Sequence, residues 1–92
     1  MDPGGGIGME VAPLHPVRAR QVGVTGGVVV TVVEPGGVAD RAGLRRGDVI
    51  LRADGREVRG PGDLVEATQD GRAAVLVRRN DGQLFVPLTV RR

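Results

Sequence analysis

The stretch Glu34–Leu51, EPGGVADRAGLRRGDVIL, decides the fold of this chain. The Pro-Gly-Gly after its first residue indicates a turn. Val38–Ala42 has room for one or two helical turns, and Gly43 can adopt the left-handed conformation that ends them. Leu44 then returns to the core, and Asp48–Ala53 follows as a strand. The stretch therefore predicts turn, short helix, turn and strand in quick succession.

The segments after it predict a hairpin, a helix and a second hairpin. Asp54-Gly55 is a strong hairpin signal and leads into a short return strand, Arg56–Val58. Pro61–Gln69 is expected to be a helix with Pro at its start. Ala73–Arg79 and Gln83–Val90 form the terminal hairpin, and the second arm alternates so that its Leu and Val residues share one face.

Three further elements precede the central stretch. Val28–Val33 is apolar on both faces, which predicts a central strand buried on both sides. Val17–Val22 is expected to be a short helix that begins after Pro16. Ile7–Ala12 alternates with period two, as a half-buried strand does. Residues 1–6 (MDPGGG) are expected to be a flexible lead-in or an expression remnant, without a signal-peptide pattern.

These elements define the expected fold class. The chain is mainly β with two or three short helices (α+β), in a small, partly open antiparallel β-barrel or sandwich with helices closing its ends. Its 92 residues allow one modest core. We expect residues 7–92 to form a single domain.

The composition excludes most catalytic chemistry. The chain has no Cys, no Ser and no Lys, so all 13 basic residues are Arg. It therefore lacks a serine or thiol nucleophile, a catalytic lysine, a disulfide and a zinc–thiolate site. The lone imidazole, His15, is expected to mark a helix entry, and Asp48 to satisfy backbone N–H groups of its turn. We expect no catalytic residue, no metal and no cofactor.

The charge pattern also argues against nucleic acid and membrane as partners. The net charge is +2, and the Arg residues are interleaved with acids as on a mixed, solvated surface. A single Phe leaves no platform on which bases could stack. No window approaches the roughly 18 consecutive apolar residues that cross a bilayer.

One pattern indicates a binding site made of backbone. In Gly6-Ile7-Gly8-Met9, two Gly residues allow successive N–H groups to converge without interference from Cβ atoms. Such a concavity holds an anion, typically a carboxylate. A Gly-rich linker that runs into a strand would have the same pattern, so the residues alone leave both interpretations open.

The longer pattern resembles the signature of PDZ domains. Glu34–Leu51 is similar to the family's "A--AGL--GDvIl" segment, and Ala53–Val58 to its "vnG--v" hairpin. Pro61–Thr68 is similar to the second helix, and Leu76–Gly82 to the final "l-v-R-dG" hairpin. The match covers Ile7–Val90. The order of elements, with the ligand-binding strand first, resembles PDZ domains of bacterial HtrA-type serine proteases.

The resemblance implies a peptide-binding site built from a loop, a strand and a helix. A peptide would add as an antiparallel strand opposite the helix around Pro61 to Gln69. The loop that receives its terminal carboxylate would be Gly6, Ile7, Gly8 and Met9. The residues that pair with it would be Met9, Glu10 and Val11. The pocket residues would be Ile7, Met9, Val11, Pro61, Val65 and Thr68.

Two departures from the family pattern bear on the ligand. Gly6 and Met9 stand where many relatives carry an aromatic residue in or before the loop, and Met adapts to varied side chains. Pro61 stands where a His would select Ser or Thr two residues before the peptide's end. We therefore expect an apolar last residue, an apolar preference at that upstream position, and micromolar affinity, about −7 to −8 kcal/mol.

The resemblance implies a protease domain in the same parent chain and a periplasmic or cell-envelope location. The domain would then serve substrate recognition or regulation of an envelope serine protease. A competing interpretation is a PDZ-type fold that binds internal segments, or that packs on a protease or another partner without capturing free C-termini.

Overall fold

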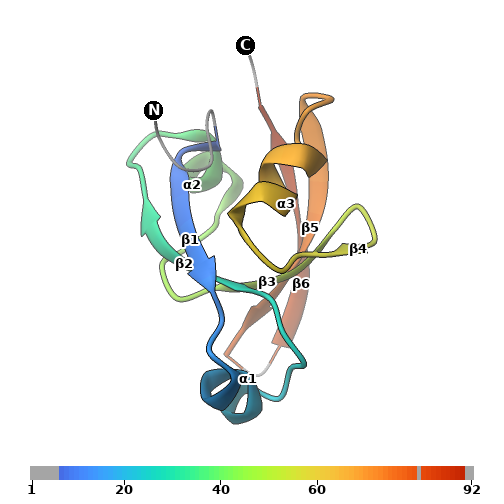
Figure 1. Cartoon of the computed structure of the whole chain (residues 1–92). Helices are drawn as coiled ribbons and strands as arrows, with labels where there is room; N and C mark the ends of the chain where they lie inside the picture. Colours follow the sequence, from blue (N-terminus) through green and yellow to red (C-terminus); the bar gives the residue numbers. More distant parts are fainter. Residues whose placement is uncertain (1–6, 81, 91–92) are drawn as a thin grey trace.

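The computed structural model describes residues 7–80 and 82–90. They form a six-stranded antiparallel sheet in the order β1-β2-β3-β5-β6, with β4 paired to β3 (Figure 1). The elements are β1 (Met9–Pro13), α1 (Pro16–Val22), β2 (Val28–Val33), α2 (Val38–Ala42), β3 (Val49–Ala53), β4 (Arg56–Glu57), α3 (Pro61–Ala67), β5 (Arg72–Arg79) and β6 (Gly82–Thr89).

This architecture confirms the expected fold class. Each predicted helix and strand is present, with ends that move by one or two residues. The first strand begins at Met9, because Ile7 and Gly8 belong to the loop before it. Residues 1–6 lie outside the described residues, and a single domain over residues 7–92 stays a prediction.

The prediction that Val28–Val33 is buried on both faces is wrong for its second half. Val28 and Val30 are buried, whereas Val32 is 46% exposed. Thr31 is an extra residue in β2 where the pairing with β1 shifts register, and Val32 then lies opposite exposed Glu10. Only one face of β2 packs on the core there, so the run of valines does not imply two covered faces.

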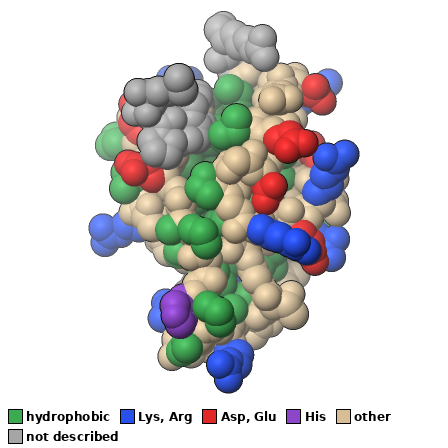
Figure 2. All heavy atoms as spheres, in the orientation of Figure 1, with side chains coloured by type: hydrophobic (Ala, Val, Ile, Leu, Met, Phe, Trp, Pro, Cys, Tyr) green, Lys and Arg blue, Asp and Glu red, His purple; other side chains and the backbone are tan. Residues whose placement is uncertain are grey.

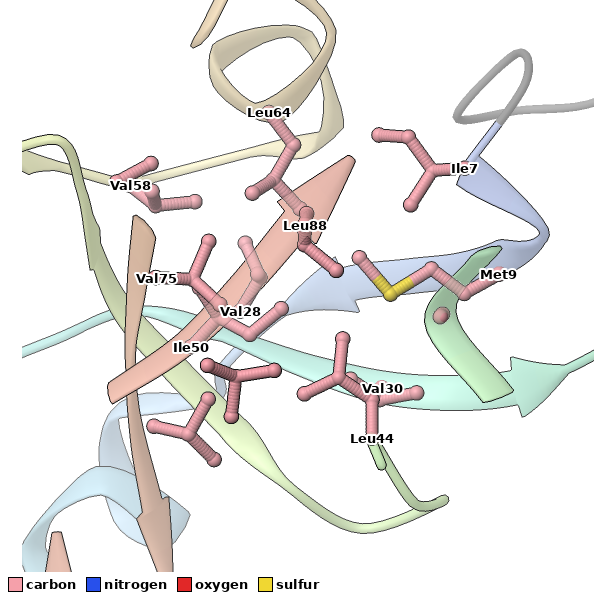
Figure 3. Packing of buried hydrophobic residues seen from close by; sticks show 14 residues of the cluster. Ile7, Met9, Val28, Val30, Leu44, Ile50, Val58, Leu64, Val75 and Leu88 are labelled. Carbon is pink, nitrogen blue, oxygen red and sulfur yellow. The ribbon is translucent and has the colours of Figure 1, made fainter. Parts of the chain in front are cut away.

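The core lies between the curved sheet and α3. β5 and β6 pair along their whole length, and alternate residues of each strand point inward. Leu64 of α3 and Leu44, from the loop after α2, complete the cluster (Figure 3). Its most deeply buried side chains are Ile7, Val28, Val30, Ile50, Val58, Leu64, Val75, Val77 and Leu88.

The central stretch folds as its residues predict. Gly43 ends α2 with a φ of 95°, a left-handed conformation that glycine adopts without strain. The Asp48 carboxylate accepts a hydrogen bond from the Arg45 N–H at 2.9 Å, which confirms its local role. It also binds Arg79 of β5, with contacts of 2.6 and 2.9 Å, and Arg79 donates to the Gly43 carbonyl at 2.8 Å. This arginine ties the turn to the terminal hairpin.

α3 begins at Pro61 as expected, and α1 begins at Pro16, one residue earlier than expected. The His15 Nδ1 accepts a hydrogen bond from the Val17 N–H at 3.1 Å, so this imidazole caps α1. The Asp63 carboxylate accepts from the Arg59 and Gly60 N–H groups and fixes the first turn of α3. In the described part of the chain, no helix is long and apolar enough to cross a membrane.

Candidate functional site

β1 is the outermost strand of the sheet formed by residues 7–80 and 82–90, and among these residues one of its two edges has no neighbouring strand. α3 packs against β1 and lies beside that edge (Figure 1). Figure 2 shows apolar side chains running down the middle of this face, with charged side chains gathered on the α3 side of them. The open edge and the helix together define the candidate site.

Two hydrogen bonds fix which backbone groups of β1 face the open edge. The Gly8 carbonyl accepts from the Glu34 N–H at 2.8 Å, and the Leu14 N–H donates to the Gly27 carbonyl at 3.0 Å. Even-numbered residues of β1 therefore point their backbone groups at β2. Because the direction alternates along a strand, Met9, Val11 and Pro13 point theirs at the open edge. The Glu10 carbonyl faces β2, where it accepts from the Thr31 hydroxyl at 3.1 Å.

The loop before β1 depends on a close approach of two glycines. Gly8 has a φ of 76°, and a Cβ there would lie 3.2 Å from the Gly37 Cα. Glycine at both positions lets the two backbones touch and starts β1 against the first residue of α2. Gly6, the first residue of the predicted carboxylate loop, lies outside the described residues.

The predicted pocket residues divide into buried and accessible groups. Ile7 and Met9 are only 1% and 5% exposed, and their side chains point into the same cluster as Leu64 and Leu88 (Figure 3). They form an apolar layer beneath the loop, and little of their side-chain surface is accessible to a ligand. Val11 is half-buried and packs at the border of this cluster.

α3 contributes the accessible groups. Val65 is 41% exposed, and Pro61, one turn before it, is half-buried. Thr68 is buried, and its hydroxyl donates to the carbonyls of Leu64 and Val65 at 2.9 and 3.1 Å. The hydroxyl of Thr68 is thus engaged within its own helix, which leaves Pro61 and Val65 as the open part of the predicted pocket.

A second feature lies at the far end of β1 and was not predicted. A hollow of about 780 Å³ opens beyond Pro13, between the end of β1 and the segment that leads into α3. We call it the Pro13 hollow. Sequence patterns offer no signal for it, because its walls come from six separate stretches of the chain. Its lining includes Pro13, Leu14, Leu51, Arg52, Arg59 and Leu76.

No charged cluster at this site suggests a catalytic or metal centre. Within residues 7–80 and 82–90, no group of three or more His, Asp or Glu side chains could hold a metal ion. The Arg79 guanidinium is the group whose pKa is raised, first by its hydrogen bond to Asp48. That pair joins the turn before β3 to the end of β5, so the groups that face the open edge of β1 are backbone groups and apolar side chains.

The chain is similar to known proteins along most of its length. The PDZ domain family model matches residues 29–79. Probable periplasmic serine endoproteases, DegP-like, from Brucella suis and Brucella abortus are 40% identical over 70 residues, which cover 70% of this chain and 14% of theirs. The chain thus corresponds to a small part of these curated relatives.

Solved structures agree with the sequence relatives. The HtrA3 PDZ domain, bound to a phage-derived ligand (FGRWV), superposes with a TM-score of 0.82 at 26% identity, covering 92% of this chain and 83% of that one. The HtrA-type protease AlgW with a decapeptide has a TM-score of 0.73 at 32% identity, covering 94% of this chain and 29% of AlgW. The chain belongs to the PDZ domain family and is a PDZ domain of the HtrA type, a binding module rather than a protease domain.

Proposed function

We propose that this PDZ domain captures peptide C-termini with an apolar last residue by adding the peptide as a strand to β1. The observation that carries the proposal is the open edge of β1 beside α3. Met9 and Val11 direct their N–H and C=O groups at that edge, so an incoming strand finds unpaired donors and acceptors at every second residue. Backbone bonds of this kind give affinity without regard to sequence.

The loop at the start of β1 would receive the terminal carboxylate. The N–H groups that would bind it are those of Ile7, Gly8 and Met9. The left-handed conformation of Gly8 turns the backbone as an anion-binding concavity requires. Hydrogen bonds to a carboxylate are charge-assisted and about twice as strong as neutral ones.

The side chains near the loop favour an apolar last residue. Ile7 and Met9 supply an apolar floor, and Val65 supplies the exposed apolar surface of α3. The ligand of the HtrA3 PDZ domain, FGRWV, ends in Val, which supports the same preference here. Pro61 and Val11 offer no hydrogen-bonding side chain, so the residue two positions before the end should also be apolar. The hydroxyl proton of buried Thr68 is already donated within α3.

Removing the peptide's terminal charge should weaken binding at least tenfold. Pentapeptides that end in Val or Leu should bind with micromolar affinity, and the same peptides with an amidated C-terminus should lose the charge-assisted bonds, worth about 1.5–3 kcal/mol. Isothermal titration of both forms measures the difference. Equal affinity of the two forms would show that the domain binds internal segments, and the carboxylate loop would then be wrongly assigned.

A charge placed on the exposed face of α3 should also weaken binding about tenfold. Val65→Glu puts a carboxylate beside the apolar peptide end and near its own carboxylate. Because Val65 is 41% exposed, the fold should tolerate the change. Val17→Glu on α1 is the matched control, since Val17 is a helical valine, 51% exposed, that is not among the predicted pocket residues. Equal affinities for the two variants would contradict the proposed pocket.

In its parent protein, the domain would recognise substrates for an envelope serine protease or regulate it. The relatives named as probable periplasmic endoproteases support both the role and the location. The parent sequence upstream should contain a His/Asp/Ser protease pattern and a signal peptide. If neither free nor amidated peptides bind, the domain acts as a scaffold that packs on its partner.

A further inference from the structure

The proposed ligand would reach the end of β1 after about five residues. β1 has five residues, Met9–Pro13, and paired strands advance together by about 3.3 Å per residue. A peptide anchored by its carboxylate at Gly8 runs antiparallel to β1, so its upstream residues move toward Pro13. The sixth residue from the C-terminus therefore arrives at the Pro13 hollow.

Strand pairing stops at the same place. Pro13 directs its backbone at the open edge but has no N–H to donate. Beyond Val11, β1 therefore offers no N–H to the carbonyls of the ligand, and the ligand backbone can turn away from β1. Pro13 and Leu14 form one wall of the hollow, and Arg59, just before α3, forms another. The hollow thus lies beyond the end of β1 and next to the segment that leads into α3.

The lining of the hollow combines an apolar surface with one uncompensated cation. Leu51 and Leu76 are half-buried and supply the apolar part. Arg59 pairs with Glu57 at 3.1 Å, so these two charges offset each other. Arg52 donates to the Gly55 carbonyl at 3.2 Å, and no carboxylate among residues 7–80 and 82–90 forms an ion pair with it.

We propose that the Pro13 hollow binds the sixth and seventh residues of the ligand, counted from its C-terminus, and that Arg52 selects an acidic side chain there. The inference rests on the proposed function, since it needs the ligand to lie along β1. A glutamate suits the lining, because its methylene groups can cover Leu51 or Leu76 while its carboxylate reaches the Arg52 guanidinium. The ligand class is thus a C-terminal segment with an apolar end and an acidic residue about six positions upstream.

The test compares octapeptides that share one apolar C-terminal pentapeptide. They carry Glu, Gln or Lys at the sixth position in one series and at the seventh in another. In at least one series, the Glu peptide should bind about three- to fivefold tighter than the Gln peptide, as expected for a partly exposed charge pair, and the Lys peptide should bind most weakly. Raising the salt concentration from 0.05 to 0.5 M should reduce the differences in affinity among the Glu, Gln and Lys peptides.

Variants then assign the preference to one residue. Arg52→Gln should remove the difference between the Glu and Gln peptides, and Arg52→Glu should reverse the order of Glu and Lys. Arg72→Gln, an exposed arginine of β5 that does not line the hollow, removes the same charge and should keep the wild-type order. The peptide series on the wild-type chain does not depend on how well any variant folds.

The outcomes separate this inference from the proposed function. If the free pentapeptide binds and its amidated form does not, while all octapeptides bind alike in both series, the Pro13 hollow is not a subsite and the proposed function stands. A preference for Glu that survives Arg52→Gln overturns the role of Arg52. If the free pentapeptide does not bind, the proposed function fails, and this inference fails with it.

Discussion

Replacing Arg79 by Met should lower the free energy of unfolding by about 3 kcal/mol, because it leaves a buried carboxylate without its partner. The Asp48 side chain is only 4% exposed and is held by two contacts to Arg79, at 2.6 and 2.9 Å. After the change, it keeps one described hydrogen bond, from the Arg45 N–H. Met keeps an aliphatic side chain of similar length, so the lost free energy of unfolding measures the contribution of the guanidinium group. We place the effect at the low end for buried pairs, since the Arg79 side chain is partly exposed.

Urea denaturation measures this loss, with Arg72→Met on the same strand as the control. Arg72 is exposed and forms no ion pair with any of residues 7–80 and 82–90, so its replacement should change the free energy of unfolding by less than about 0.5 kcal/mol. The double variant Asp48→Asn/Arg79→Met should recover part of the loss, because it removes the unpaired charge as well. A loss under 1 kcal/mol in Arg79→Met would contradict the role given to the pair.

Replacing Gly27 by Ala should lower the free energy of unfolding by about 2–4 kcal/mol, through a backbone clash and an unfavourable dihedral. Gly27 has a φ of 127°, and a Cβ there would lie 2.7 Å from the Ile50 carbonyl oxygen. That oxygen belongs to β3 in the middle of the sheet and cannot move without disturbing its pairing. Gly27 also accepts the hydrogen bond from Leu14, so the clash should displace the end of β1.

The neighbouring glycine provides the control for this prediction. A Cβ at Gly26 would meet no atom within 4 Å, and Gly26 does not adopt a left-handed φ. Gly26→Ala should therefore leave the melting temperature within a few degrees of the wild type. Thermal unfolding followed by circular dichroism compares the two variants directly. Similar melting temperatures for both would mean that the contact with Ile50 relaxes at little cost.

Much of the fold could be predicted because the local signals for helix ends and strand faces agree with the PDZ-like sequence motif. Gly43 ends α2, His15 and Asp63 begin α1 and α3, and alternation assigns the two faces of β6. Each of these signals lies within a few residues of the structure that it determines. The position of the proposed peptide-binding strand came from the family resemblance, since the Gly-rich loop alone was equally consistent with a linker.

The features that could not be predicted arise from contacts between distant segments. Asp48 was expected to bond its own turn, but its second partner, Arg79, lies 31 positions away. Val32 is exposed because the extra residue Thr31 shifts the register against β1, which composition cannot reveal. Ile7 and Met9 are buried because side chains of α3 and β6 pack over them. The alternation of these residues with Gly8 predicts which face they share, but it does not predict how small their exposed fraction is.

The missing N–H of Pro13 also bears on whether two copies of this domain can pair through β1. An open strand edge can pair with the same edge of a second copy and seed aggregation, and proline on an edge strand is one way proteins prevent it. Here the edge offers N–H donors only at Met9 and Val11 before Pro13 interrupts the row. In the proposed binding mode, an edge this short holds one peptide whose carboxylate is fixed at the loop, whereas two copies that paired through it would share few hydrogen bonds. The residue that ends the ladder thus also shortens the edge that a second copy could pair with.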